Sequence, residues 1–456
     1  MIWTFSKFAV NIGIHTAFLI KLQTDVNIPL VSAMIVLPGT PFLPNPKRRL
    51  ANLPPELTSA RTQLVGISLE SRHDFILYLN LLNNYLETIF QYVSTKDHQL
   101  NSSIRFAETI IISDTVPWHG IERPKLAFGK KLETISWTLM HEIVTVAAAM
   151  SLNHSCLSSK IIDDLVETEP ENLKDTAEAW TPVIKQYKSA VSVANFGLEC
   201  LSHATTLDIV TIDPNCFILL EKTANISTQI SMLVKSSWLN RLEFNRAGSF
   251  STKNNGTLSR VAIYALDELK FCQKLIGSFD NNCIVFRHEN WLSYLYLMQS
   301  YATAYSVLFL SIDYYQQSKL GLALGLINYG LLSLQAKQVE TPGKNKNIVT
   351  KFKTKFASHK NELYIKDLQS VTTLNIDKLL FKSSSGAFLK DLTFLFDQLI
   401  QLHLKLTKEN DNLFFEDVVD WKDAKKDSKW PTGAAIPTST VDTFRPQSLI
   451  GGKKYV

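Results

Sequence analysis

Apolar side chains adopt a helical spacing only after about residue 56 of the chain. From Leu57 to Val93 they recur at steps of three and four residues, which places them along one face of a long helix. Before that point, repeated prolines remove amide donors that helices and inner strands both need. We therefore expect residues 1–56 to form strands and loop, and residues 57–406 to form the helical core of the same domain.

The central part of the sequence predicts one short strand and several long helices. The run Glu108–Ser113, with three consecutive isoleucines, is typical of a strand. Between Leu132 and Leu152 the apolar positions cover more than one helical face, so this helix must have neighbours on two sides. Small residues between 190 and 201 indicate a helix that approaches its neighbour closely. Similar spacing predicts helices from residue 214 onwards and over residues 258–276, 291–337 and 387–406.

Several of these features together predict a mainly α fold. Residues 291–337, as one very long helix or two close ones, combine tyrosine and leucine with small residues, as helices in tetratricopeptide-like stacks do. No repeat of about 34 residues is visible, so an irregular helical solenoid is expected. The tail, residues 407–456, turns from alternating lysine and aspartate to proline, threonine and serine. Such a composition buries too little apolar surface to order itself, so we expect the tail to be partly disordered or draped.

The helix predicted to begin near Pro214 has more apolar residues than one face can hold. Asp213 is placed to cap its first turn. The four residues Phe217–Leu220 are all apolar, and successive helical positions point in different directions. At least one of them is therefore expected to point away from the side that this helix buries.

Composition and charge narrow the function classes. Hydrophobic residues make up 45% of the 456 positions, which is enough for one large helical body. Lysine and arginine total 47 against 42 acidic residues, and a net charge of +5 is too small for a nucleic-acid-binding protein. The five cysteines are scattered without the close pairs of a structural zinc site, which indicates thiols in a reducing compartment.

Neither a membrane span nor a signal peptide is expected. No uninterrupted apolar run reaches the roughly 18 residues that a bilayer-spanning helix requires. The stretch from Phe8 to Leu22 is apolar, but Asn11 and His15 interrupt it and no small-residue cleavage site follows. We expect a cytoplasmic protein whose membrane association is peripheral and comes through partners.

The residues that could take part in catalysis form no sequence motif that indicates a particular reaction. His141 and Glu142 resemble the start of a zinc-protease helix, but Thr145 stands where the second histidine is needed. The segment Gly321–Gly325 lies inside an apolar helical pattern without the Lys-Ser/Thr pair of a phosphate loop, so close packing is its expected role. We expect no metal, no cofactor and no enzymatic activity, and we keep an unidentified enzyme on a helical solenoid as the alternative of another class.

A basic surface is predicted shortly before the last long helix. Aromatic residues lie at helical spacing among its lysines, so an amphipathic helix with a solvated lysine face is the simplest interpretation. Contact with acidic lipid or an acidic partner helix is the alternative. The lysines are Lys351, Lys353, Lys355 and Lys360.

Five blocks of sequence, in order, resemble Bro domains. The first runs from Trp118 through residues 126–139 to Ala147–Leu152 and is similar to the strand and signature helix of that family. The later blocks are similar to its alanine, tyrosine, glycine and asparagine-tyrosine landmarks: residues 187–201, Ser300–Tyr305, Gly321 and Lys360–Tyr364. The family's usual alanine-glutamine helix is replaced by Ala224–Gln229, and the opening residues differ. The chain therefore most resembles the divergent fungal PalC-type pH-response adaptors.

The resemblance implies a boomerang-shaped helical solenoid with a small β-sheet near its N-terminal part. It also implies an apolar patch that binds the C-terminal amphipathic helix of the ESCRT-III core filament subunit. The surplus apolar residues are the candidates for that patch, with burial in the core as the competing interpretation for each. They are Ile212, Phe217 and Leu220, with Leu331 as a weaker addition.

The function that follows from the resemblance is that of an adaptor in the fungal alkaline ambient-pH pathway. Its implied partners are the ESCRT-III core filament subunit and components of the pH-receptor complex. Its implied location is the cytoplasm, with recruitment to endosomes or plasma-membrane foci. A general endosomal multivesicular-body sorting scaffold is the alternative within the same structural class.

Overall fold

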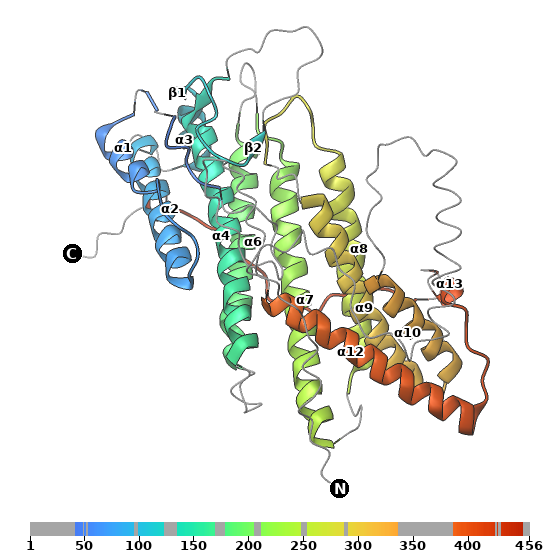
Figure 1. The fold of residues 1–456 in the computed structure, drawn as a ribbon. Helices are drawn as coiled ribbons and strands as arrows, with labels where there is room; N and C mark the ends of the chain where they lie inside the picture. The colour runs from blue at the N-terminus through green and yellow to red at the C-terminus, as the bar shows by residue number, and fades with distance from the viewer. Residues whose placement is uncertain are drawn as a thin grey trace, which may run out of the picture.

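Long helices packed side by side make up most of the described molecule (Figure 1). The computed structural model describes residues 42–48, 50–51, 53–94, 99–122, 135–168, 178–204, 211–247, 253–286, 291–335, 386–424, 426 and 430–449. The predicted N-terminal segment therefore lies mostly outside the described residues, and the four lysines of the predicted basic surface lie wholly outside them. The predicted mainly α fold class is confirmed.

The helices follow one another as an irregular solenoid. From α4 to α10 each helix packs mainly against the next one in the chain, and α12 crosses back over α10, α9 and α4. The bounds are α1 (Pro55–Thr62), α2 (Arg72–Val93), α3 (Leu100–Glu108), α4 (Leu139–Thr168), α6 (Thr181–Ser202), α7 (Asn215–Ala247), α8 (Asn255–Gly277), α9 (Trp291–Gln316), α10 (Leu320–Gln335) and α12 (Gly386–Glu409), followed by the π-helical turn η3 (Asn410–Phe414), the short helix α13 (Trp421–Ala424) and the 3₁₀ turn η5 (Gln447–Leu449).

The predicted small β-structure takes the form of two antiparallel ribbons. Strand β1 (Ile111–Ser113) pairs with β3 (Trp137–Thr138), and β2 (Ile121–Glu122) pairs with β4 (Val285–Phe286). The second ribbon joins segments more than 160 residues apart, so it fastens the N-terminal part of the molecule to the segment before α9. Local sequence patterns do not reveal that pairing.

Two helix boundaries differ from the prediction for local reasons. The segment 57–93 is broken because Gly66 adopts a left-handed backbone (φ 80) and Ser71 then caps α2 in a capping box with Asp74. Helix α4 begins at Leu139 because Trp137 and Thr138 pair with β1. The predicted cap of α7 is confirmed, since Oδ1 of Asp213 accepts a hydrogen bond from the Asn215 amide at 2.9 Å.

Small residues set how closely the elements approach. A Cβ at Gly197 of α6 would overlap the ring of Phe217 on α7, which confirms the close approach predicted for residues 190–201. At Gly321 and Gly325 of α10, a Cβ would overlap the carbonyl oxygens of residues 417 and 419. Close packing is therefore confirmed there too, but against an extended chain rather than a helix.

Among the described residues, one segment, Tyr294–Gln316 of α9, is long and apolar enough to cross a bilayer. In its most apolar window 83% of the residues are buried inside the protein, as in a core helix.

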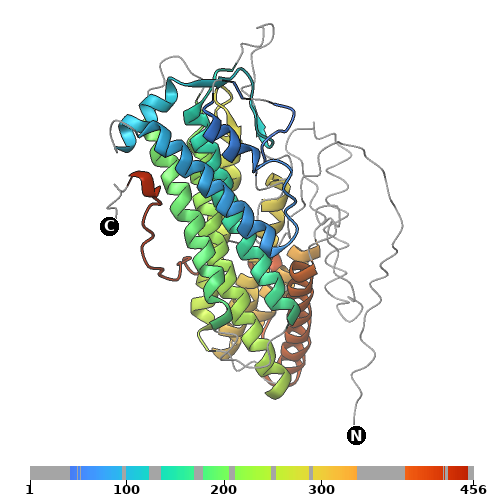
Figure 2. The same cartoon turned by 90° about the vertical axis from the view of Figure 1, so that its left-hand side faces the viewer.

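Residues 430–449, here called the strap, run as an extended chain across the outside of several helices (Figure 2). Backbone amides of the strap bond to α8 at Arg260, to α7 at Gln229, to α6 at Ser192 and to α2 at Glu87. Of the two predicted alternatives, a disordered or a draped tail, the draped one describes these residues. Four distant helices supply polar partners for the strap, and Trp430, Ile436, Phe444 and Leu449 pack against the core.

Candidate partner-binding groove

The four residues predicted to form an exposed apolar patch are all buried. Ile212, Phe217, Leu220 and Leu331 each expose 3% of their surface or less. The Phe217 ring fills the space above Gly197 and meets Phe286 edge-on, with 5.9 Å between ring centroids. The prediction of an exposed patch at these positions is therefore wrong. Helix α7 has neighbours on two sides, α6 and α8, so it can bury successive apolar residues, and only Ile218 of Phe217–Leu220 is partly exposed.

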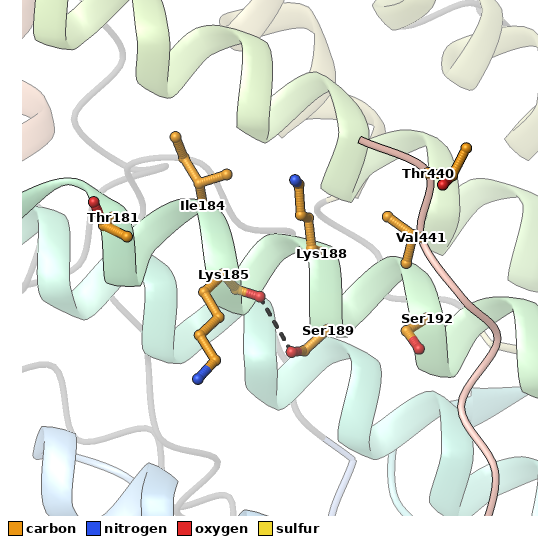
Figure 3. Close-up of a pocket in the computed structure, with 8 residues that line it drawn as sticks. All are labelled: Thr181, Ile184, Lys185, Lys188, Ser189, Ser192, Thr440 and Val441. Atoms are coloured by element: carbon orange, nitrogen blue, oxygen red, sulfur yellow. Dashed lines mark hydrogen bonds between the residues drawn. The ribbon is translucent and has the colours of Figure 1, made fainter. Parts of the chain in front are cut away.

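An open groove of about 560 Å³ lies between α6 and the strap (Figure 3). Six of its lining residues come from α6 at helical spacing, so they form one stripe along that helix. The opposite wall is the backbone and side chains of Thr440 and Val441. The α6 residues are Thr181, Ile184, Lys185, Lys188, Ser189 and Ser192. We refer to this feature as the α6–strap groove.

The groove is lined by apolar and basic side chains, with Lys188 between Ile184 and Val441 in Figure 3. Ile184 and Val441 supply branched apolar surface, and Val441 packs against a buried cluster of Ala190, Val191 and Ala224. Lys185 is exposed and Lys188 is partly buried, and the lining set contains no acidic residue. An elongated, amphipathic and acidic ligand matches these properties.

The strap wall is held to α6 by specific hydrogen bonds. Nζ of Lys188 donates to Oγ of Ser439 at 2.7 Å, and Oγ of Ser192 donates to the carbonyl oxygen of Asp442 at 2.6 Å. Beyond the groove, the ring of Phe444 meets Phe196 edge-on at 5.4 Å. The groove therefore exists only while the strap is docked.

The end of the strap is anchored by two carboxylates. The guanidinium of Arg445 donates two hydrogen bonds to Glu199, at 2.6 and 2.7 Å, and this pairing raises the pKa of Arg445. Glu87 of α2 accepts hydrogen bonds from the amides of Gln447 and Ser448 and from the Ser448 hydroxyl. These contacts join α6 and α2 through the strap.

A second apolar surface lies at the turn after α12. Leu413 and Phe415 are 70% and 74% exposed, and Phe415 has a left-handed backbone (φ 56). The side chain of Asn410 fixes this turn, because it bonds both the amide and the carbonyl of Glu416. The surrounding Asp411 and Asp417 are acidic, so this turn differs in charge from the α6–strap groove.

A polar centre around Glu142 is buried in the core. The carboxylate of Glu142 accepts hydrogen bonds from Nε of Arg61 at 2.6 Å and from the indoles of Trp118 and Trp137 at 2.8 and 2.9 Å. A fourth donor, the hydroxyl of Tyr85, lies 3.1 Å away. Burial would lower the pKa of Arg61, but the neighbouring carboxylate raises it above its usual value. This centre is a structural ion pair, and sequence analysis missed it because Arg61 lies 81 positions before Glu142 in the chain.

Within the described residues, titratable groups do not gather into a metal or nucleophile site. No group of three or more His, Cys, Asp or Glu side chains there could hold a metal ion. Burial raises the pKa of the Cys272 thiol to about 12 and also raises the pKa values of Cys200 and Cys216. These thiols are therefore protonated near neutral pH and are weak nucleophiles.

Comparison with solved structures finds similarity to proteins that include Bro1 domains. The chain is 16% identical to ALIX in complex with the SIVmac239 late domain, over 86% of this chain and 44% of that one, with a TM-score of 0.47. It is 11% identical to the Bro1 domain studied for endosomal targeting, over 85% and 81% of the two chains, with a TM-score of 0.45. It is 17% identical to the ALIX BRO1 domain solved with CHMP4C, over 87% and 86%, with a TM-score of 0.44.

Comparison by sequence gives one family. No curated protein matches the chain. A family model described as "Family of unknown function (DUF5355)" matches residues 137–453, which include α4 to α12, the groove and the strap. Since the match spans well over half of the sequence, the chain belongs to this family of unknown function, DUF5355.

Proposed function

We propose that the protein is a non-catalytic adaptor whose α6–strap groove binds the C-terminal amphipathic helix of the ESCRT-III core filament subunit. The observation that carries the proposal is that two apolar side chains, Ile184 and Val441, line the groove together with lysines and no acidic residue. The Bro-domain resemblance of the sequence motifs supports the same class of partner. One of the similar solved structures is a complex of the ALIX BRO1 domain with CHMP4C.

Binding would follow the helix-in-groove mode. Apolar residues of the partner, one turn apart, would contact Ile184 and Val441, while acidic residues on its flank would meet Lys185 and Lys188. The lysines of the lining mainly speed association and select for charge, whereas the apolar anchors supply most of the affinity.

The pathway we assign is fungal alkaline ambient-pH signalling, in which the adaptor would bridge pH-receptor components to ESCRT-III filaments. The PalC-type resemblance of the sequence supports this assignment. Recruitment from the cytoplasm to endosomes or plasma-membrane foci follows from such bridging. A deletion strain should then grow at acidic pH and fail at alkaline pH, whereas a general endosomal sorting scaffold would give a cargo-sorting defect at both.

The binding test uses a synthetic C-terminal helix of the filament subunit and the full chain in a titration. Replacing Ile184 by aspartate removes an apolar anchor and should weaken binding by about 2 kcal/mol, roughly thirtyfold. The double change Lys185→Glu and Lys188→Glu should weaken it further at low salt, because it reverses the charge of the groove lining.

Two matched controls locate the site. Lys274→Glu makes one such charge reversal, half of that in the double variant, at an exposed position of α8 away from the groove, and Phe415→Asp removes apolar surface at the turn after α12. Both should bind as the unaltered protein does. Loss of binding in Phe415→Asp with retention in Ile184→Asp would place the partner on the other apolar surface and contradict the proposal.

A further inference from the structure

We infer that Ser448 is a phosphorylation site and that a phosphoryl group there releases the strap from the helices. The inference stands whether or not the groove binds an ESCRT-III helix, because it concerns the docking of the strap itself. It rests on the placement of Ser448 against a carboxylate, on Arg445 three residues before it, and on the opposite charge around Ser439.

Ser448 is docked on a negative charge. Its hydroxyl lies 2.9 Å from Oε2 of Glu87, and its amide lies 3.1 Å from the same oxygen. The hydroxyl donates to this oxygen, and a phosphoryl group on it has no proton to donate and carries a charge of about −1.5 to −2 near neutral pH. The modified residue would therefore place two like charges in contact and remove one hydrogen bond, which favours the detached strap.

The strap is suited to detachment as a unit. Its polar contacts with α6 and α2 are hydrogen bonds and one surface ion pair, in which Arg445 is 39% and Glu199 31% exposed. Its apolar contacts there include Val441, Phe444 and Leu449, all of them only partly buried. Segments held in this way open at much lower free energy than the buried core does.

Ser439, in the same strap, has the opposite environment. Its hydroxyl accepts a hydrogen bond from Nζ of Lys188, and Lys185 lines the same groove. A phosphoryl group at Ser439 would gain charge-assisted contacts with these lysines and should hold the strap in place. The two serines therefore provide a matched pair in which one modification has opposite effects.

Arg445 identifies the class of enzyme. A protein kinase with an acidic substrate groove selects a cationic residue near the acceptor hydroxyl. In the docked strap this guanidinium is occupied by Glu199, so such a kinase would act on the transiently detached strap and the phosphoryl group would oppose its return. In the transfer, Oγ of Ser448 bonds to the γ-phosphorus of ATP as the bond to the bridging oxygen of ADP breaks, and the hydroxyl proton passes to the kinase base.

Release would also remove one wall of the α6–strap groove, since Thr440 and Val441 belong to the strap. Phosphorylation of Ser448 would thus withdraw Val441 from whatever occupies that groove.

The test is hydrogen exchange of the full chain carrying genetically encoded phosphoserine at 448 or at 439. With phosphoserine at 448, amides of residues 434–449 should exchange at least tenfold faster than in the unmodified chain, while peptides from α4 keep their protection. With phosphoserine at 439 the same amides should exchange at the unmodified rate or more slowly. The inference would be overturned if phosphoserine at 448 changed the exchange rate of the strap amides by less than twofold. It would also be overturned if phosphoserine at 448 and phosphoserine at 439 accelerated that exchange equally.

Two further arms separate electrostatics from general destabilisation. In a Glu87→Gln background the like charge is gone, so phosphoserine at 448 should accelerate strap exchange less than threefold, and an undiminished effect would refute the mechanism.

Incubation with ATP, Mg²⁺ and the purified catalytic subunit of a cyclic-AMP-dependent kinase should label Ser448. Arg445→Gln should reduce that labelling at least tenfold although it loosens the strap, and unchanged labelling would refute the proposed kinase class.

Discussion

Carboxylates fasten two regions of this molecule, and the regions differ in what surrounds those groups. Glu142 is completely buried and meets a cation and three neutral donors, of which only Trp137 is close to it in the chain. Glu87 and Glu199 lie at the surface and meet the strap, where water competes for every contact. An ion pair out of water is costly to break, whereas one in water contributes little. The comparison indicates that the Glu142 region fixes the fold and that the strap region is the part that can change.

The largest effect is expected at the buried pair. Glu142→Gln leaves the guanidinium of Arg61 buried without a counterion, which should lower the free energy of unfolding by about 3–5 kcal/mol. Urea denaturation followed by circular dichroism measures this. Glu199→Gln is the matched surface control and should cost less than about 1 kcal/mol.

A double variant sharpens that result. Replacing both partners, Arg61→Met with Glu142→Leu, removes the unpaired charge and should recover part of the loss, although the indoles of Trp118 and Trp137 lose their acceptor. A cost for Glu142→Gln no greater than that of Glu199→Gln would mean that burial does not distinguish the two regions.

A second buried carboxylate should give the next largest effect. Asp391 of α12 accepts hydrogen bonds from the hydroxyls of Tyr301 and Tyr305 on α9, the latter at 2.7 Å, and burial with this charge raises the pKa of both tyrosines. Asp391→Ala leaves two buried hydroxyls without this acceptor and should cost about 2 kcal/mol in urea denaturation. Asp391→Asn keeps an acceptor and should cost clearly less, so equal losses would argue against the hydrogen bonds as the cause.

The sequence predicts burial correctly where the position of a side chain on its own helix decides whether it is buried. Of the predicted stripe on α2, Leu79 is partly buried, and the other members are buried because they lie on the face that α2 presents to the core: Phe75, Leu82, Leu86, Ile89 and Val93. The same reasoning fails at Phe217–Leu220, because periodicity within one helix does not reveal how many neighbours that helix has. Both α6 and β4 lie against α7, and they cover residues that a single-face argument leaves exposed.

The groove and the strap lay beyond sequence reasoning for a different physical reason. The groove joins α6 to residues 440 and 441, and the anchor of Arg445 lies 246 positions away in the chain. Residues of the strap are ordered by partners that composition does not identify. The useful signal would have been Arg445 itself, an isolated cation in a tail rich in threonine and serine.

A pH-dependent loss of stability is expected from α12. Burial lowers the pKa of His403 to about 4, against about 6.5 in the unfolded chain. As pH falls below 6.5 the unfolded state binds the proton first, so stability declines until about pH 4 and does not decline further. Because the ring is only partly buried, we expect His403 to contribute about 1 kcal/mol of loss at pH 5 relative to pH 7. His403→Gln should remove that part of the pH dependence in urea titrations, and an unchanged dependence would exclude His403 as its source.

The smallest effect should come from the surface pair, and it should be local. Arg445→Gln breaks the two hydrogen bonds to Glu199 but leaves Phe444 against Phe196. An exposed ion pair contributes about 0.5–1 kcal/mol, so hydrogen exchange at the Phe444 amide should accelerate roughly two- to fivefold. Global unfolding in urea should not change measurably, because the core is intact.

Raising the salt concentration should accelerate exchange at the Phe444 amide of the unaltered chain by the same factor. The effect should be smaller in Arg445→Gln, since screening weakens only the ion pair that this variant lacks. Lys426→Gln, which breaks the exposed pair with Asp423 outside the strap, is the control and should leave the Phe444 amide unchanged. A global loss of stability in Arg445→Gln comparable to that in Glu142→Gln would show instead that the strap belongs to the cooperative core, and the distinction between the two regions would fail.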